Sequence, residues 1–268
     1  DSPPTWHEGR LLFGSHNGWV YCLDAADGRL AWRFRAAPTD RQIVSYNQVE
    51  SVWPVHGSVL ALNDLVYAAA GRNSYLDGGI YLVALDATTG QLRHEGRVLN
   101  AHQDPAKTKG GSHDMPGAKP DVLVSDRQYI YMQSITFDTS LKQVDKQSGR
   151  AHLFATAGFL DDLAWNRNFW VFGRGWTITD KKKVQPRKGQ LLVHDDALTY
   201  GIRYFTDPGA PFSVMFYPAK QGYSLFADRN ALSAAAETLS ESKKKRRGKK
   251  PKGPSSKTSP VSKWEQWI

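Results

Sequence analysis

Apolar and polar residues alternate in short runs along most of the chain, and almost no stretch follows the 3.6-residue period of a helix. Several of the apolar runs end at glycine, as at residues 10–14, 65–71 and 169–173. Short strands with turn signals between them predict an all-β protein. The Ala-rich residues 231–239 are the exception and predict one isolated helix.

One pattern occurs twice. Residues 20–32 read VYCLDAADGRLAW, and residues 82–94 read LVALDATTGQLRH. Each copy predicts a strand, a tight Asp-x-x-x-Gly turn and a second strand, in which the Asp carboxylate accepts from backbone N–H groups and Gly28 or Gly90 supplies a positive φ. Trp32 is predicted to dock between neighbouring repeat units, and His94 stands at its place in the second copy.

Further copies extend the repeat over much of the chain. A Gly-ended strand precedes each hairpin, a third unit follows at residues 121–125 and 129–133, and a fourth at residues 169–173 and 190–196. Four-stranded antiparallel units repeated radially make a β-propeller. The predicted fold class is therefore all-β, a propeller of four-stranded antiparallel blades.

The first copy also carries a family resemblance. Residues 14–32 follow the pattern G-S-x-x-G-x-V-Y-x-L-D-A-x-x-G-x-L-x-W, which resembles the PQQ-like blade motif of quinoprotein dehydrogenases and of the propeller lipoprotein of outer-membrane assembly. Residues 51–57 and 158–162 are similar to stretches of large planctomycete-type bacterial PQQ-like repeat proteins. The resemblance covers most of residues 5–205. It implies part of a ring of roughly seven or eight blades and a periplasmic or extracellular location.

The expected organisation has three parts. Residues 1–230 form about four blades plus fragments. Residues 231–262 form the short helix and a disordered Lys-rich insertion, and residues 263–268 start a further blade. The chain begins without Met, so we expect a fragment of a larger polypeptide.

Charge is concentrated in one tract. The formal net charge is +9, yet residues 243–263 hold ten of the 35 basic residues and no acid, which leaves 25 basic against 26 acidic residues elsewhere. The tract is either a solvated disordered insertion, which we favour, or a polyanion-binding segment. Nucleic acid is not an expected partner of the nearly neutral body. The polyanion alternative rests on Lys243, Lys244, Lys245, Arg246, Arg247, Lys249 and Lys250.

Several classes of function find no support. Cys22 is the only cysteine, which excludes an internal disulfide and a thiolate-rich metal site, and it reads as a small buried strand residue. No apolar run is long enough to span a membrane as a helix. The sequence has no Gly-x-Ser-x-Gly elbow, His-Glu-x-x-His motif or P-loop, so hydrolysis is not predicted.

The loops after the Gly-ended strands are the candidate ligand-binding face, because loops of a propeller converge around its channel. An anionic or carbohydrate ligand would use guanidinium forks and stacking aromatic rings. The favoured alternative is that the arginines pair with acids on adjacent blades. The candidates are His16, Asn17, Arg72, Asn73, Tyr75, Asp77, Arg174 and Trp176.

Three acidic or histidine-containing groups are weaker candidates. His102, Asp104, His113 and Asp114 lie in one polar connection and could ligate a divalent metal, but a solvated loop is favoured, and no metal is expected. The pairs at residues 161–162 and 195–196 are expected to form turns or caps.

The predicted function is a non-catalytic propeller that presents loops to a protein or glycan partner, with no catalytic residue and no cofactor. One alternative is a quinoprotein dehydrogenase with PQQ and Ca²⁺. That resemblance implies a vicinal cysteine pair beside the quinone, which Cys22 alone cannot supply. The other alternative is polyanion binding through the Lys-rich tract.

Overall fold

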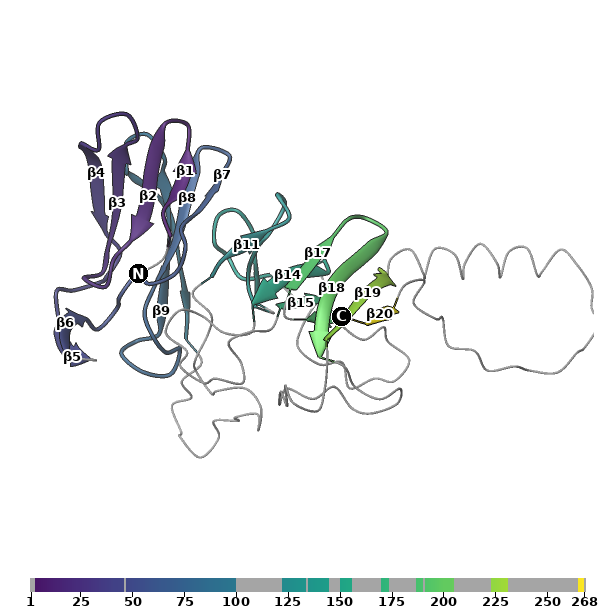
Figure 1. Ribbon diagram of the computed structural model, residues 1–268. Coiled ribbons are helices and arrows are strands. Elements are labelled where there is room, and N and C mark those ends of the chain that lie inside the picture. Colours follow the sequence, from purple (N-terminus) through teal and green to yellow (C-terminus); the bar gives the residue numbers. More distant parts are fainter. Residues whose placement is uncertain are drawn as a thin grey trace, which may run out of the picture. The chain divides into compact units, whose positions relative to one another are not determined.

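The computed structural model describes residues 3–45, 47–99, 122–133, 135–144, 150–155, 170–173, 187–189, 191–204, 223–230 and 265–267. All regular secondary structure in these residues is β (Figure 1). The chain divides into unit 1, residues 1–167, and unit 2, residues 168–268. None of the described residues forms an apolar helix of membrane-spanning length.

Unit 1 begins with two complete antiparallel four-stranded sheets, blade 1 and blade 2. Blade 1 has the order β1 (Thr5–His7), β2 (Arg10–Gly14), β3 (Trp19–Asp24) and β4 (Leu30–Arg35). Blade 2 has β7 (Leu60–Leu62), β8 (Leu65–Ala70), β9 (Ile80–Asp86) and β10 (Leu92–Val98), again as neighbours in chain order. Between the two blades in the sequence, β5 (Gln42–Ser45) and β6 (Gln48–Ser51) form a separate hairpin.

A third sheet of unit 1 is formed by β11 (Val124–Ser125), β12 (Ile130–Met132) and β13 (Ile135–Phe137), and β14 (His152–Ala155) follows it in the chain. Unit 2 contains β15 (Trp170–Gly173) and β16 (Arg187–Gly189), which pair with each other. Its four-stranded sheet has the order β17 (Leu191–His194), β18 (Leu198–Tyr204), β19 (Tyr223–Arg229) and β20 (Glu265–Trp267). The predicted all-β fold of four-stranded antiparallel blades is confirmed.

The strand at the end of the chain pairs within unit 2. Residues 265–267 were expected to belong to the start of a further blade, and they form β20 beside β19. The expected boundaries at residues 230 and 263 stay predictions.

The two predicted Asp-x-x-x-Gly turns have the expected geometry. The Asp24 carboxylate accepts from the Ala26 N–H (2.8 Å), and the Asp86 carboxylate accepts from the Thr89 N–H (2.9 Å). Gly28 and Gly90 have φ of 72° and 70°, in the left-handed region that favours glycine. Local sequence chemistry therefore determines how each blade turns between its third and fourth strands.

The core of unit 1 lies on both faces of blade 2. Along β8, Val66, Ala68 and Ala70 belong to the core shared with blade 1, and Tyr67 and Ala69 belong to the core shared with the third sheet. A strand buried on both faces reads as a continuous apolar run, as β8 does.

Trp32 docks between blades as the repeat predicts. Its side chain is buried, its indole Nε1–H donates to the Ala87 carbonyl of blade 2 (3.0 Å), and its ring lies against Gly90. A Cβ atom on Gly90 would lie 2.6 Å from the Trp32 ring, so the second turn needs glycine for space as well as for φ.

Candidate functional site

The segment of residues 51–57 joins the loops that follow the Gly-ended strands β2 and β8. Three backbone hydrogen bonds make the connection: Ser51 N–H to His16 (2.9 Å), Val55 N–H to Ser15 (3.0 Å), and Gly71 N–H to Pro54 (3.0 Å). The backbone of both loops is thereby held in one arrangement. The sequence marked residues 51–57 only as a family-like stretch, and the structure gives them this connecting role.

A buried ion-pair cluster lies beneath these loops. Glu50, only 6% exposed at the end of β6, pairs with the Arg72 guanidinium and lies 3.2 Å from the His56 Nε2. The Arg72 Nε is buried and has no hydrogen-bond partner among the described residues. Arg72 is therefore paired with an acid of the separate β5–β6 hairpin.

The charges in this cluster follow from burial and pairing. Burial alone would raise the pKa of Glu50, but hydrogen bonds from Ser45, Arg72 and His56 together with the Arg72 charge leave that pKa lowered. Burial lowers the pKa of His56, which the neighbouring Glu50 only partly opposes. Glu50 is thus ionised near neutral pH, and the cluster fixes the loops electrostatically.

A second set of contacts holds the 72–79 loop from outside. Asp77 pairs with the Arg41 guanidinium, and the Asp77 carbonyl accepts from the Trp53 indole N–H (2.8 Å). Arg41 lies 5.1 Å over the Trp53 ring, and Trp53 packs edge-on against Tyr81 at 6.2 Å. Arg97 lies 5.0 Å over Tyr81. The result is a row of alternating arginine and aromatic side chains.

The predicted asparagines shape their own loops. Asn17 accepts from the Trp19 N–H (3.2 Å) and donates to the Tyr21 hydroxyl (2.8 Å). Asn73 accepts from the N–H of the half-buried Tyr75 (2.8 Å). The described candidates thus lie in two loops joined by residues 51–57, and their role in ligand binding stays a prediction.

Other predicted candidates lie outside the described residues. These are Arg174, Trp176, the pair at residues 161–162, the polar connection with His102, Asp104, His113 and Asp114, and the Lys-rich tract. The pair at residues 195–196 is described and forms the expected turn. The Asp195 carboxylate accepts from the N–H groups of Ala197 and Leu198, each at 2.7 Å.

The sequence reasoning missed the exposed apolar hairpin β5–β6. Val44 and Val49 are cross-strand partners, 76% and 60% exposed, and Ile43 beside them is also exposed. Leu76, in the loop that Arg41 and Trp53 hold, is 61% exposed. The signal was present as two β-prone runs around an asparagine, and Asn47 has the positive φ of such a turn.

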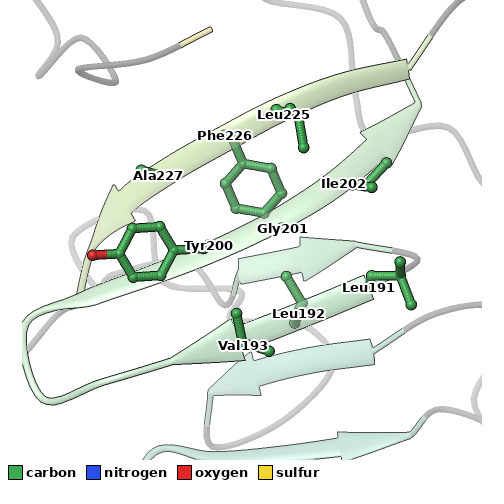
Figure 2. Close-up of a pocket in the computed structure, with 9 residues that line it drawn as sticks. All are labelled: Leu191, Leu192, Val193, Tyr200, Gly201, Ile202, Leu225, Phe226 and Ala227. Carbon is green, nitrogen blue, oxygen red and sulfur yellow. The ribbon is translucent and has the colours of Figure 1, made fainter. Parts of the chain in front are cut away.

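Unit 2 carries an apolar hollow of about 490 Å³ on its four-stranded sheet (Figure 2). Leu191, Val193 and Leu225 are substantially exposed there, and the only side-chain polar group in the lining is the Tyr200 hydroxyl. A sheet face of this kind is typical of a surface that packs against another layer. The lining residues are Leu191, Leu192, Val193, Tyr200, Gly201, Ile202, Leu225, Phe226 and Ala227.

The described residues do not fit a quinone site of the dehydrogenase type. Cys22, the only cysteine, is buried in β3, and burial raises the pKa of its thiol. It packs in the core between blades 1 and 2 and cannot form a vicinal pair. Arg72, the described member of the two predicted guanidinium groups, is paired with Glu50.

Comparisons with known proteins give fold relatives only. No family model matches the chain, and no curated protein matches it. Among solved structures, BamB from Moraxella catarrhalis is 14% identical with a TM-score of 0.39, over 74% of this chain and 54% of that one. The quinohemoprotein alcohol dehydrogenase ADHIIG from Pseudomonas putida HK5 is 13% identical with a TM-score of 0.36, over 74% of this chain and 32% of that one.

BamB and the dehydrogenase are both PQQ-like β-propeller proteins, the class that residues 14–32 resemble. The chain spans about half the length of BamB and a third of the dehydrogenase. The similarity to planctomycete-type proteins and the number of blades in a ring stay predictions.

Proposed function

We propose that the chain is a non-catalytic binding module that presents the β5–β6 hairpin and the 72–79 loop to a protein partner. The observation that carries this proposal is exposed apolar area beside arginines on a preorganised backbone. Val44 and Val49 project from a hairpin that directly follows Arg41, and Arg41 is tied to the 72–79 loop through Asp77.

The chemistry of this surface suits a protein better than a small molecule. Protein interfaces are enriched in aromatic residues and arginine around a desolvated apolar centre. The loops are held by Glu50 and by residues 51–57, so little loop entropy is lost on binding. The charged groups Arg72 and Asp77 are already paired internally, which leaves aliphatic side chains as the available contacts.

Site-specific crosslinking tests the proposal. The photo-reactive residue p-benzoylphenylalanine replaces Val44 in the protein expressed in its native cells. The same replacement at Leu30 is the control. Leu30 is also an exposed aliphatic strand residue, but it begins β4 next to the Asp24–Gly28 turn, at the opposite end of that strand from Arg41.

We expect a discrete protein adduct from position 44 and none from position 30. Adding Val49→Asp should reduce the adduct roughly tenfold, because a carboxylate in the apolar centre of an interface is costly to desolvate. Equal adducts from both positions, or an adduct indifferent to Val49→Asp, would overturn the proposal.

Binding assays with purified protein address the other ligand classes. We expect no saturable, Ca²⁺-dependent rise of the melting temperature with PQQ, since a ligand bound only by the folded state must raise it. Such a rise would replace this proposal by the dehydrogenase alternative. Saturable binding to a glycan that Val44→Asp leaves unchanged would point to a glycan partner instead.

We also propose that the protein acts in the periplasm or outside the cell, on the resemblance to PQQ-like propellers alone. The Lys-rich tract at residues 243–252 is proposed to have no specific partner. Deleting it should leave retention on heparin at physiological salt unchanged. A loss of salt-sensitive retention would assign the tract to polyanion binding.

A further inference from the structure

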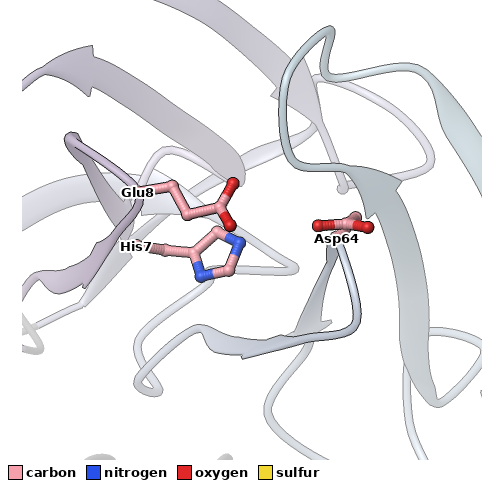
Figure 3. A group of neighbouring side chains, drawn as sticks. All are labelled: His7, Glu8 and Asp64. Carbon is pink, nitrogen blue, oxygen red and sulfur yellow. The ribbon is translucent and has the colours of Figure 1, made fainter.

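Two hairpin turns from different blades bring one imidazole and two carboxylates together. His7 ends β1 and Glu8 begins the two-residue turn to β2. Asp64 is the second residue of the equivalent turn between β7 and β8. One donor atom from each of the three side chains lies within 4.8 Å of the other two. Figure 3 shows the three side chains facing one another across the gap between the turns.

The backbone on both sides of this gap is fixed. Three hydrogen bonds hold it: Ala25 N–H to the Gly9 carbonyl (2.8 Å), Ala87 N–H to the Asp64 carbonyl (2.9 Å), and the Thr5 hydroxyl to the Val59 carbonyl (2.6 Å). The first two tie each turn to the Asp-x-x-x-Gly turn of its own blade, and the third joins β1 to the segment before β7. The three side chains therefore project from a prearranged frame.

Among the described residues, the polar side-chain groups at this place have no ion-pair or hydrogen-bond partner that would neutralise them. Within the described part of the chain, neither Glu8 nor Asp64 takes part in an ion pair. The Nε2 atom of His7 is buried and has no hydrogen-bond partner among the same residues. A buried ring nitrogen without a partner is unfavourable, and two adjacent carboxylates without a cation repel each other. A bound cation would relieve both.

We propose that His7, Glu8 and Asp64 bind a divalent first-row metal ion, with Zn²⁺ as the best match, and that the ion joins blade 1 to blade 2. One imidazole nitrogen favours such an ion over Ca²⁺ or Mg²⁺, which prefer all-oxygen sites. Two carboxylates balance its double charge.

The three donor atoms, which lie within 4.8 Å of one another, must move somewhat closer together to coordinate one metal ion. Zn–N and Zn–O bonds of about 2.0–2.2 Å place tetrahedral donors about 3.4 Å apart. The exposed Glu8 and Asp64 side chains can reach this spacing by rotation about their own bonds. Three protein ligands leave the fourth position for water.

The test uses the full 268-residue chain after removal of metal with EDTA. ZnCl₂ is titrated by calorimetry, the melting temperature is followed at each concentration, and the visible absorption of Co²⁺ reports the donor set. We expect one saturable site and a melting temperature that rises with Zn²⁺, because the three ligands meet only in the folded chain.

Single-residue variants locate the ion. His7→Ala and Asp64→Asn should each weaken Zn²⁺ binding at least about 100-fold, since even residues that only orient metal ligands contribute 10- to 100-fold. The controls His94→Ala and Glu95→Gln remove the same groups from exposed positions of β10 and should bind as the wild type does.

The melting temperature in EDTA shows whether each variant folds, and Glu8→Gln, in an exposed turn, replaces any variant that does not. Undiminished binding by folded His7→Ala and Asp64→Asn would place the ion elsewhere and overturn the proposal. So would the absence of heat and of any melting shift up to about 1 mM Zn²⁺.

Discussion

The two faces of blade 2 meet their neighbours by different means. On the face toward blade 1, Trp32 reaches across from β4, donates to Ala87 and lies against Gly90. On the face toward the third sheet, the residue equivalent to Trp32 is His94, which is exposed. There Tyr67 of blade 2 reaches outward instead, and its hydroxyl donates to the Thr139 carbonyl (3.0 Å).

The difference shows that a repeat can lose its signature residue and keep a packed junction. At the second junction, between blade 2 and the third sheet, backbone packs directly against backbone. Leu141 approaches Gly96 so closely that a Cβ on that glycine would lie 2.6 Å from the Leu141 carbonyl oxygen. A junction in which one large side chain reaches from one blade to the next should be sensitive to substitution of that side chain. A junction built from backbone approach and several medium-sized residues should lose less at any one position.

The largest effect is expected from Trp32→Ala. Removing a buried indole from the first junction should lower the free energy of unfolding by about 3–5 kcal/mol. Urea denaturation measures it, with Trp6→Ala as the control. Trp6 is 67% exposed on β1, and its loss should cost less than about 0.5 kcal/mol. Similar costs for both tryptophans would contradict the role of Trp32 between the blades.

A matched pair of glycine variants isolates the same contact. Gly28→Ala should cost about 1 kcal/mol for its positive φ alone, because no atom lies within 4 Å of the new Cβ. Gly90→Ala has nearly the same φ but meets the Trp32 ring, and should cost about 3 kcal/mol.

The double variant with Trp32→Ala sharpens this test. In that background the loss of unfolding free energy caused by Gly90→Ala should fall to the loss caused by Gly28→Ala, because the clashing ring is gone. An undiminished cost would mean that Gly90 is needed for another reason.

The second junction should respond less to a single change. Tyr67→Phe keeps the buried ring and removes only the hydrogen bond to Thr139, so about 1 kcal/mol should be lost. Tyr21→Phe, which removes a hydroxyl bonded near the surface to Asn17, is the control and should cost a few tenths of that, about 0.3 kcal/mol. A loss above about 3 kcal/mol for Tyr67→Phe would show that the second junction also depends on one residue.

The smallest effect is a pH dependence of the turn that presents Gly90. Arg93, followed by the N–H and hydroxyl of Thr89, holds the pKa of Asp86 below its usual value. A carboxyl with a lowered pKa stabilises the fold above its unfolded pKa of about 4, and this contribution is lost as the pH falls through the folded value. The wild type should therefore melt above Asp86→Asn at pH 7, and the gap should shrink below pH 4. A gap constant down to pH 2 would exclude this charge effect.

Much of the repeat could be predicted from local sequence, because its determinants are close together in the chain. Asp24 and Gly28 form one turn, and Asp86 and Gly90 form the other, so spacing alone identifies both hairpins. Trp32 was predictable as an inter-blade residue because it is a large apolar side chain at the last position of the first copy of the motif.

The candidate site was predictable only in part, because its groups meet through the tertiary fold. Arg72 was expected from the loop position, but its partner Glu50 lies on the separate β5–β6 hairpin and meets Arg72 only in the folded chain. His7 and Asp64 are far apart in sequence and meet because two turns face each other. No spacing rule within one segment marks such a pair.

Because blade 2 is buried on both faces, its two faces are covered at different times during synthesis. Blade 1 has left the ribosome before β8 and β9 are made, so their first face can be covered at once. Their second face waits for the third sheet and Leu141, about 40 residues after β10 ends at Val98. At about 5–20 residues per second, Tyr67, Leu82 and their neighbours stay uncovered on the nascent chain for roughly 2–8 s.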